Sequence, residues 1–417
     1  MKFQLFCLPT IPGSLEERER LRPIGRNRDR YQAMIEELRE LVVMADEAGF
    51  DCFATTDHHF HSEGFEASVA PIVLYTDLAA RTKRISFAPL GIVLPANNPL
   101  RVAEELAVLD HLTKGRVYAG FARGYQDRWS NVLGQQVPVQ GTPMDGGEVD
   151  KHNRRVHEEY EDIIYKAWSD DLLQHKGEFF QIPYPYDEGI RRWPAHAWTR
   201  QYGQPGELDD ENVIRGISVI PKPYQDPPLK AFQPFSVSES TIRRTAKNGV
   251  IPVILTANPP DFRRLCGLYR DVANENGRDL KLGQNVAAVR AVAFGDTEQQ
   301  AVSLLERTNY TGFQAYFSGF GFWEAFRTAE DAEKYPLDPY TPLPPEEWTL
   351  DRFRGVKYGL AGTVDQVKRE IEALHNVHGD NGELEWFTWF FDQGVMSLDE
   401  AKRQLELFSE HILPEFH

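Results

Sequence analysis

The stretch RISFAPLGIVLPANNPLRVAEELAVLDHLTKG (84–115) couples a strand pattern to a helix pattern and decides the fold prediction. Its first twelve residues are mostly apolar, as in a strand that is buried in a sheet. Asn98 then stands in a helix N-cap position, Pro99 suits the first helical turn, and Gly115 is a typical residue at a helix end. Residues 84–115 therefore predict one strand followed by one helix.

The same alternation recurs along the chain. Apolar runs that we predict as strands occupy residues 2–8, 51–56, 84–95, 116–124, 231–240, 250–255, 285–295 and 384–391. Helical periodicity is found near residues 29–48, 67–80, 100–112, 156–168, 241–248, 261–276, 297–307 and 398–412. Eight alternations favour a (β/α)8 TIM barrel, although a doubly wound open sheet would show the same pattern.

Three stretches are longer than these units require, at residues 125–151, 169–230 and 308–357. Long connections inside a compact domain are usually lids or binding loops. No convincing linker divides the chain. We therefore expect a single domain over residues 1–417, an α/β barrel with long loop insertions after strands 4 and 7.

Composition and charge exclude several classes of function. The chain has 46 basic and 63 acidic residues and a formal net charge of -17, without a basic block that could bind a polynucleotide, so no nucleic-acid partner is expected. No segment approaches the roughly 20 apolar residues that span a bilayer, and the N-terminal apolar run is too short for a signal peptide. The three cysteines are widely spaced in apolar surroundings. These features predict a soluble cytoplasmic protein with reduced, buried cysteines and no membrane partner.

The most polar strand end lies in TTDHHFHSEGF (55–65), directly after the second predicted strand. In a barrel, residues just beyond the C-terminal ends of the strands line the active site. This rule brings together Asp57, His58, His59, Leu90, Gly91, Arg123, Gly124, Tyr125, Glu239 and Ser240 at one end of the barrel.

The histidines admit three interpretations. On a strand, His58 and His59 point to opposite sides, so both could bind one metal ion only if the chain turns there. We therefore expect no metal site. A single imidazole at the end of a strand can serve as a general base near neutral pH, and a purely structural role for the histidines stays open.

A phosphate site is a second hypothesis. Arg123 ends an apolar strand, and its guanidinium has the planar donor geometry that phosphate prefers. Ser240 stands in a predicted N-cap position at the start of a helix, and Arg243 lies one turn further along. The alternative is an ion pair between Arg123 and Glu239 beside an ordinary helix cap.

These stretches resemble a known family. TTDHHFHSEGF, GIVLPANNPLRVAEELAVLDHLTKGRVYAGFARGYQDRW (91–129) and the later FSVSES (235–240) are similar to the bacterial luciferase-like monooxygenases, which are flavin-dependent enzymes on a (β/α)8 barrel. The likeness is close over residues 1–125 and looser over 231–295. GLAGTVDQVKREIEAL (359–374) also has the look of the family.

The resemblance implies roles for individual residues. His58 would be the catalytic imidazole, and the Leu90–Gly91 bond falls where luciferases have a non-proline cis peptide under the flavin. The residues that the resemblance implies for cofactor binding are Asp57, Leu90, Gly91, Arg123, Tyr125, Val237, Glu239, Ser240 and Arg243. Those expected for a substrate pocket are His59, Asn98, Phe317, Phe320 and Trp323.

Departures from the family limit these expectations. Ala122 replaces the reactive cysteine of luciferases, which excludes thiol chemistry there, and Arg243 replaces a small hydroxyl residue. The segments 169–230 and 308–357 do not match luciferase, so light emission from a long-chain aldehyde is not expected. The aromatic run TNYTGFQAYFSGFGFWEAF (308–326) predicts either a mobile lid and apolar pocket wall or the ordinary packing of an inserted helix.

The resemblance implies a two-component monooxygenase. FMN would be reduced by a separate NAD(P)H-dependent flavin reductase, and this chain would use reduced FMN and O2 to insert one oxygen atom into a small hydrophobic or aromatic substrate through a C4a-(hydro)peroxyflavin. No GxGxxG motif follows a predicted strand, which disfavours a built-in dinucleotide-binding domain. A homodimer is also implied. The alternatives are a deazaflavin-dependent hydride-transfer enzyme on the same barrel, a non-catalytic flavin-binding subunit and, less favoured, a barrel hydrolase.

Overall fold

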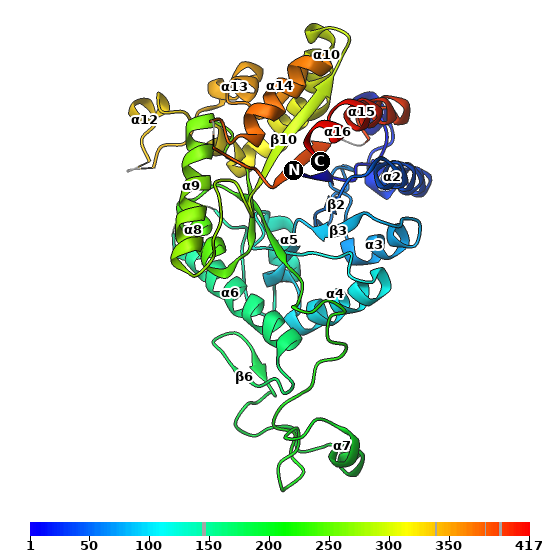
Figure 1. Ribbon diagram of the computed structural model, residues 1–417. Helices are drawn as coiled ribbons and strands as arrows, with labels where there is room; N and C mark the ends of the chain where they lie inside the picture. The colour runs from blue at the N-terminus through cyan, green and yellow to red at the C-terminus, as the bar shows by residue number, and fades with distance from the viewer. Residues whose placement is uncertain (144–146, 338–339, 380, 392–393) are drawn as a thin grey trace. The chain divides into compact units, whose positions relative to one another are not determined.

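The computed structural model describes residues 1–417 except 144–146, 338–339, 380 and 392–393, and it forms two compact units (Figure 1). The first unit contains residues 1–91 and 230–417, and the second contains residues 92–229. Parts of two predicted insertions, 144–146 and 338–339, lie outside the described residues.

The first unit is built on a parallel sheet. Its strands follow the order β3 (Ser86–Pro89), β2 (Cys52–Thr55), β1 (Lys2–Cys7), β12 (Trp386–Phe391), β10 (Ala287–Phe294), β9 (Ile251–Ile254) and β8 (Ala231–Ser236), and β11 (Gly359–Gly362) pairs with β10. The last predicted strand pairs directly with the first, from Lys2 beside Trp386 to Cys7 beside Phe391. Pairing of the last strand with the first is expected in a closed barrel and argues against the doubly wound alternative.

Helices connect these strands, as the alternation predicted. They are α1 (Leu15–Arg20), α2 (Arg28–Ala48), α3 (Pro71–Ala79), α8 (Glu239–Asn248), α9 (Pro259–Glu275), α10 (Glu298–Leu305), α14 (Val364–His375), α15 (Leu398–His411) and α16 (Leu413–Phe416). The termini of α2 illustrate the local causes: Asn27 accepts a hydrogen bond from the Arg30 N–H at the start, and Gly49 adopts φ 101° at the end. The pair β11–α14 was not among the eight predicted units.

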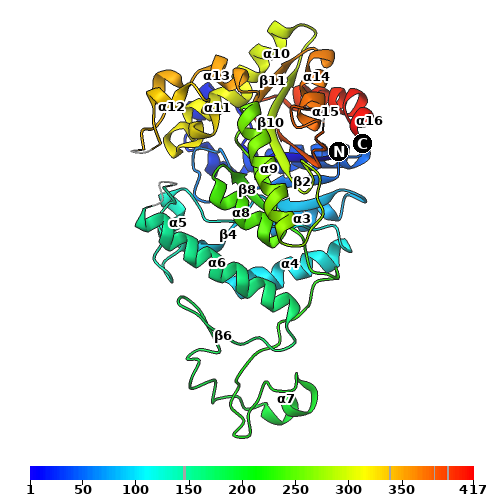
Figure 2. The same ribbon diagram turned by 60° about the vertical axis from the view of Figure 1, so that its left-hand side comes forward.

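The second unit carries β4 (Ile92–Val93) and β5 (Ala119–Ala122), which pair in parallel. Its main helices are α4 (Pro99–Thr113), α5 (Asp127–Leu133) and α6 (Glu148–Ser169). Helices α4 and α6 lie side by side (Figure 2), and the Trp168 indole N–H donates to the Ala103 carbonyl at 3.0 Å. Residues 170–229 extend beyond them with the hairpin β6 (His175–Lys176) and β7 (Gln181–Ile182) and helix α7 (His196–Tyr202).

The insertion predicted at 308–357 is formed by short helices joined by turns and irregular segments. It contains α11 (Thr311–Ala315), α12 (Asp331–Lys334) and α13 (Leu350–Gly355), with 3-10 turns between them. Its aromatic side chains are spaced closely enough to form a core of their own. The rings in mutual contact in this core are Tyr310, Phe313, Trp323, Phe326, Phe353 and Tyr358.

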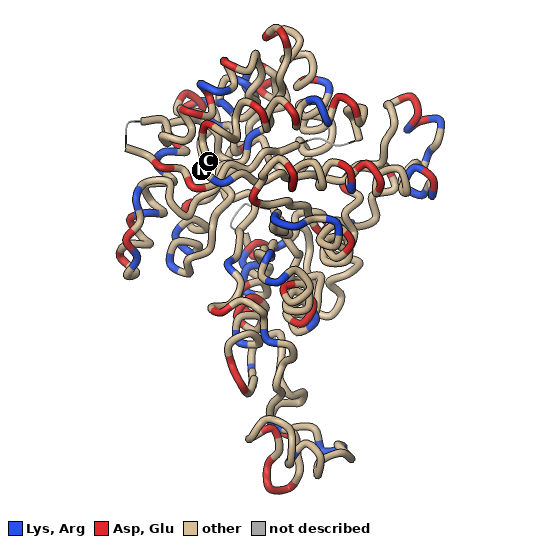
Figure 3. Tube along the Cα trace, turned by 45° about the vertical axis from the view of Figure 1, so that its right-hand side comes forward, with Lys and Arg blue, Asp and Glu red and all other residues tan. Residues whose placement is uncertain are grey.

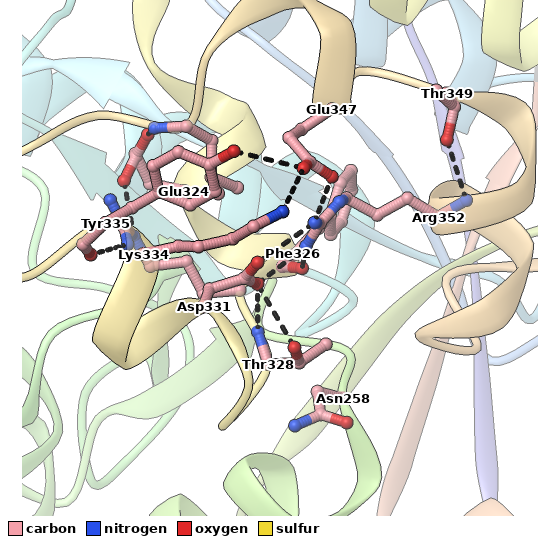
Figure 4. A network of polar contacts seen from close by, with 12 residues as sticks. Asn258, Glu324, Phe326, Thr328, Asp331, Lys334, Tyr335, Glu347, Thr349 and Arg352 are labelled. Atoms are coloured by element: carbon pink, nitrogen blue, oxygen red, sulfur yellow. Dashed lines mark hydrogen bonds and ion pairs between the residues drawn. The ribbon is translucent and has the colours of Figure 1, made fainter.

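A partly buried ionic network holds this insertion together (Figure 4). The Arg352 guanidinium donates to both carboxylate oxygens of Asp331, at 2.7 and 3.0 Å, and to Glu347 at 2.6 Å. These contacts raise the pKa of Arg352, the hydrogen bond to Asp331 contributing most. Such a bidentate contact fixes the relative position of α12 and α13.

Charges of both signs are interspersed along the chain (Figure 3). In the described part of the chain, every helix is either too short or too polar to cross a membrane. The three cysteines, Cys7, Cys52 and Cys266, are buried and unbridged, as predicted. Burial raises the pKa of the Cys52 thiol to about 12, so this thiol stays protonated and unreactive.

Candidate active site

A group of histidines and one carboxylate lies directly after β2. Thr55 ends the strand, and the chain then turns, so the side chains of His58 and His61 come to the same place. Their rings are nearly parallel, 21° apart, with centroids separated by 5.9 Å. The two histidines are 6% and 7% exposed. Burial at this level requires hydrogen-bonding partners for the ring nitrogens.

Glu66 supplies the main partner. Its carboxylate Oε1 lies 3.0 Å from Nδ1 of His58, and Oε2 lies 3.4 Å from Nδ1 of His61. Glu66 is 1% exposed and takes φ 49°, a left-handed conformation that is uncommon for residues other than glycine. The backbone N–H of His58 donates to the Ser68 carbonyl at 3.2 Å, which anchors the turn. We call His58, His61 and Glu66 the histidine–carboxylate cluster.

The insertion at 308–357 reaches this cluster through Tyr316. The Tyr316 hydroxyl lies 2.9 Å from Nδ1 of His61. The Tyr316 ring also contacts Phe317 and Phe320, at centroid separations of 5.3 and 5.8 Å, and all three rings are half-buried. Two residues predicted for the substrate pocket, Phe317 and Phe320, are thus joined to the cluster by Tyr316.

The other predicted pocket residues lie in different surroundings. Trp323 is 1% exposed within the aromatic core of the insertion, which matches the packing interpretation of that segment. Asn98 begins α4 in the second unit, where its Oδ1 accepts hydrogen bonds from the N–H groups of Leu100 and Arg101. His59 is half-buried, and its Nε2 lies 3.0 Å from Oδ1 of Asp57.

Leu90 and Gly91 follow β3, next to β2. The peptide bond between them is cis, at the position where the resemblance implied one. The Leu90 N–H donates to the Thr55 carbonyl at 2.7 Å. This hydrogen bond fixes the end of β3 beside the start of the histidine loop.

The start of α8 differs from the prediction. Ser240 was expected to cap the helix, but Ser238 does so: it has extended backbone angles, and its hydroxyl accepts from the Thr241 N–H at 3.3 Å. A cap residue accepts from an N–H two or three positions later, so Ser238 rather than Ser240 satisfies the geometry. The helix therefore begins at Glu239, and Ser240 is its second residue.

This first turn gathers several donors. The hydroxyls of Ser240 and Thr241 lie 3.1 and 3.0 Å from the hydroxyl of Ser238, and Ser240 is exposed. Arg243 is exposed one turn further along, and Val237, between β8 and α8, is half-buried. Hydroxyls, the N–H groups of a helix start and a nearby guanidinium are the donor types that bind phosphate.

In the second unit, Arg123 follows β5 and forms an ion pair with Asp150 of α6. Glu239 of the first unit is paired with Arg264. Gly124 has φ 83°, and a Cβ atom there would lie 2.6 Å from the Trp129 ring, so only glycine fits. Tyr125 accepts a hydrogen bond on its hydroxyl from Gln126 Nε2 at 2.9 Å.

Comparison with known proteins identifies the family. The family model for luciferase-like monooxygenases matches residues 1–381. The chain belongs to the luciferase-like monooxygenase family. The predictions that it is an enzyme and that it is a luciferase-like monooxygenase are confirmed. A curated relative, the oxygenase component of the flavin-dependent trigonelline monooxygenase of Acinetobacter baylyi, is 30% identical over 389 residues, which are 92% of this chain and 90% of the relative.

Solved structures with the same fold confirm the barrel. The oxygenating constituent of 3,6-diketocamphane monooxygenase from Pseudomonas putida, a type II Baeyer-Villiger monooxygenase in complex with FMN, matches with a TM-score of 0.70 and 20% identity over 100% of this chain and 99% of its own. The coenzyme F420 dependent tetrahydromethanopterin reductase from Methanopyrus kandleri matches with a TM-score of 0.56 and 17% identity over 100% and 99%. The predicted (β/α)8 class is therefore correct.

In this luciferase-like monooxygenase, the sequence did not indicate Glu66 or the contact with His61 of Tyr316, which lies in the aromatic run predicted as a lid or packing segment. Glu66 follows His58 by eight positions and His61 by five through an irregular loop, and Tyr316 is 255 positions from its partner His61. The residue types themselves gave a signal, since a buried imidazole beside a carboxylate is a common arrangement. Periodicity carries no information about contacts across such a loop.

Proposed function

We propose that this chain is the oxygenase component of a two-component system. It would take reduced FMN from a separate NAD(P)H-dependent flavin reductase and use O2 to insert one oxygen atom into a small hydrophobic or aromatic substrate. The relative named as an oxygenase component and the FMN complex of the structural neighbour support this proposal. The observation that carries it is the buried histidine–carboxylate cluster at the end of β2, next to a layer of aromatic rings.

His58 would hold and move a proton in this reaction. Its Nδ1 lies 3.0 Å from the buried Glu66 carboxylate, so Nε2 is the ring atom that would exchange a proton with the substrate. Proton transfer by a positioned side chain contributes about 10²- to 10⁴-fold to catalysis. Reduced FMN, when bound, would supply the electrons that activate O2.

The donors of α8 fit the phosphate of FMN. Ser240 and Thr241 present hydroxyls at the helix start, and Arg243 adds positive charge. In the second unit, Arg123, which the family resemblance implies for phosphate binding, is paired with Asp150. A helix N-terminus favours anions through its free N–H groups and the helix dipole.

The aromatic layer would select an apolar substrate and exclude water. Tyr316, Phe317 and Phe320 are half-buried, and the Tyr316 ring contacts the other two. Apolar walls with few polar groups are typical of sites for hydrophobic ligands. Removal of water also protects reactive oxygen species in the site from hydrolysis.

The first experiment is an anaerobic titration of the purified protein with photoreduced FMN, in which tryptophan fluorescence reports binding. Saturable binding is expected.

Ser240→Ala should weaken this binding and leave stability unchanged, whereas Ser238→Ala should lower the free energy of unfolding by about 1 kcal/mol because it removes the cap. His58→Asn should still bind FMN but lose about 10²-fold or more in substrate oxygenation, with O2 released as peroxide. Failure of reduced FMN to bind would overturn the proposal.

A second candidate is hydride transfer with a deazaflavin. The structural similarity to the coenzyme F420 dependent reductase favours it, because that cofactor has a deazaflavin ring. The two candidates differ in their need for oxygen. Titration with the deazaflavin cofactor in the same assay, with turnover measured in the absence of O2, separates them. A homodimer and a cytoplasmic location remain predictions.

A further inference from the structure

Glu66 has no assigned role, yet it is the residue around which the histidine loop is arranged. Its carboxylate is buried, and each of its oxygens faces Nδ1 of a different imidazole. A buried carboxylate is costly unless it accepts hydrogen bonds from donors. The loop therefore has to present N–H or O–H groups to Glu66.

The contact with His58 defines where the proton of that ring lies. If Nδ1 of His58 carried a lone pair, this lone pair would face a carboxylate oxygen at 3.0 Å, which is repulsive. With the proton on Nδ1, the same contact is a charge-assisted hydrogen bond, the stronger kind. Thr56 Oγ1, also 3.1 Å from Nδ1, could donate to that nitrogen only in the opposite tautomer. The hydroxyl can also accept from Nδ1–H, so Thr56 fits either tautomer, whereas the carboxylate fits only the tautomer protonated on Nδ1.

The backbone supports the same conclusion. Glu66 takes φ 49°, which costs a residue with a Cβ roughly 1 kcal/mol or more. Its neighbour Ala67 donates its N–H to the Pro9 carbonyl at 2.6 Å, which holds the chain in this course. A cost of this kind persists where the surroundings enforce it, and it often marks a functional site. Here the left-handed conformation of Glu66 directs its carboxylate into the histidine loop.

We propose that Glu66 is a positioning residue, which holds His58 in the tautomer protonated on Nδ1 and so presents Nε2 as the atom that accepts or donates the catalytic proton. Its value for catalysis rests on the function proposed above. The other carboxylate oxygen is engaged by His61, which Tyr316 contacts in turn, so the insertion at 308–357 helps to hold the carboxylate in place.

The test uses ¹⁵N-histidine labelling of the full chain without any flavin. The chemical shifts of the two ring nitrogens report the tautomer, and His58→Asn identifies the His58 signal among the 12 histidines. Wild type should show the proton on Nδ1. Glu66→Gln should keep this tautomer, because its carbonyl oxygen still accepts the bond. Glu66→Met, which removes the acceptor, should move the proton to Nε2 as Thr56 becomes the donor to Nδ1.

Glu63→Met is the matched control, because Glu63 lies in the same loop but is exposed. It should leave the His58 signals unchanged. Circular dichroism of each variant shows that it is folded, and if the Met variant does not fold, the tautomer of wild type still tests the inference. A wild-type proton on Nε2, or an unchanged tautomer in folded Glu66→Met, overturns the inference.

Turnover separates this inference from the proposed function. If the tautomer inference and the proposed function both hold, Glu66→Met lowers kcat by about 10²-fold or more with little change in KM. Glu66→Gln then retains more activity than Glu66→Met. The tautomer measurement needs neither FMN nor substrate. A correct tautomer in a protein that does not bind reduced FMN would therefore overturn the proposed function alone.

Discussion

Arg290 lies in the middle of β10 and has no exposed surface. Its Nη1 donates to the carbonyl of Val289, and its guanidinium lies over the Phe262 ring at 5.1 Å. Within the described residues, Nε and Nη2 find no hydrogen-bonding partner. Burial lowers the pKa of Arg290 to about 10. Burial thus destabilises the charged form of the guanidinium by an amount on the order of 3 kcal/mol.

We expect Arg290→Met to leave the stability of the protein unchanged or to raise it. Methionine fills similar volume and needs no polar partner, and replacement of buried charge by apolar side chains is often neutral or stabilising. The midpoint of thermal unfolding at pH 7 should stay the same or rise. Arg81→Met, at an exposed position, should change the free energy of unfolding by less than about 0.5 kcal/mol. A fall in the midpoint for Arg290→Met would show that the guanidinium has a favourable partner.

Two glycines should respond in opposite ways to alanine. At Gly124, φ is 83° and the added Cβ would meet the Trp129 ring at 2.6 Å, so Gly124→Ala should lower the free energy of unfolding by about 1–3 kcal/mol. At Gly267, inside α9, no described atom apart from its chain neighbours and the backbone of the helix lies within 4 Å of the added Cβ, so alanine should raise the free energy of unfolding by about 0.5–1 kcal/mol. Urea unfolding of both variants measures this. Equal effects at the two sites would contradict the argument.

At this scale, the sequence predicted some residues and not others. Polar residues at strand ends, such as His58, could be found because strand position follows from local pattern. The ion pair expected as an alternative for Arg123 involves Glu239, but the structure pairs these residues with Asp150 and Arg264. Partners in space depend on packing between distant elements, and a single sequence does not contain that information.

The insertion at 308–357 is an element whose stability depends on ionisation. Burial opposes the charge on Asp331, but the hydrogen bonds from Arg352 and from the Thr328 N–H outweigh it and lower its pKa. The pKa of Glu347 is also lowered, mainly by its hydrogen bond with Arg352. These carboxylates therefore stabilise the folded insertion only while they are ionised.

Asp331→Asn should show this dependence on pH. The stabilisation from a carboxylate with a lowered pKa is complete above its ordinary pKa near 4 and is lost as the pH falls through the lowered value. Wild type should therefore exceed Asp331→Asn in free energy of unfolding by about 1–3 kcal/mol at pH 7, and the difference should shrink in acid. Urea unfolding at pH 7 and pH 3 measures both. Lys334→Met, at an exposed position in the same network, is the control; a difference that persists in acid would contradict the assignment.

Most elements were predictable because each βα unit carries its own local signals. Residues 84–115 contain a strand pattern, an N-cap and a helix end, and the structure places α4 at Pro99–Thr113. The structure of the insertion was not predictable, because its turns are short and its helices form around contacts between aromatic rings rather than from periodicity. Ser238 and Ser240 show the same limit: both fit a cap, and only backbone geometry distinguishes them.

At the scale of the whole molecule, many of the exposed large apolar side chains lie in residues 183–229 of the second unit. Helix α7 has no buried residue, and Trp198, Tyr202 and Ile220 are 69%, 62% and 75% exposed. The segment is held mainly by its own hydrogen bonds, for example between Arg200 and the Asp209 carbonyl at 2.8 Å. Regions with few buried contacts open at low free-energy cost.

Limited digestion with trypsin should therefore cut first at Arg191, Arg192 or Arg200, which are exposed in this segment. Mass spectrometry of the early fragments identifies the site. A triple variant should delay the first cut; it carries Arg191→Gln, Arg192→Gln and Arg200→Gln. The control variant Lys247→Gln, in α8, should not delay it. A first cut elsewhere in the chain would contradict the expected order of opening.

The pairing of β1 with β12 has a consequence for synthesis of the protein. The first strand leaves the ribosome hundreds of residues before its neighbour at Trp386–Phe391, so β1 and β10 keep unpaired edges throughout translation. Unpaired edges recruit other strands and promote aggregation. A chain that is released early, before residue 386, would retain both edges permanently. Nascent chains of this enzyme are therefore expected to depend on chaperones until the final strand is in place.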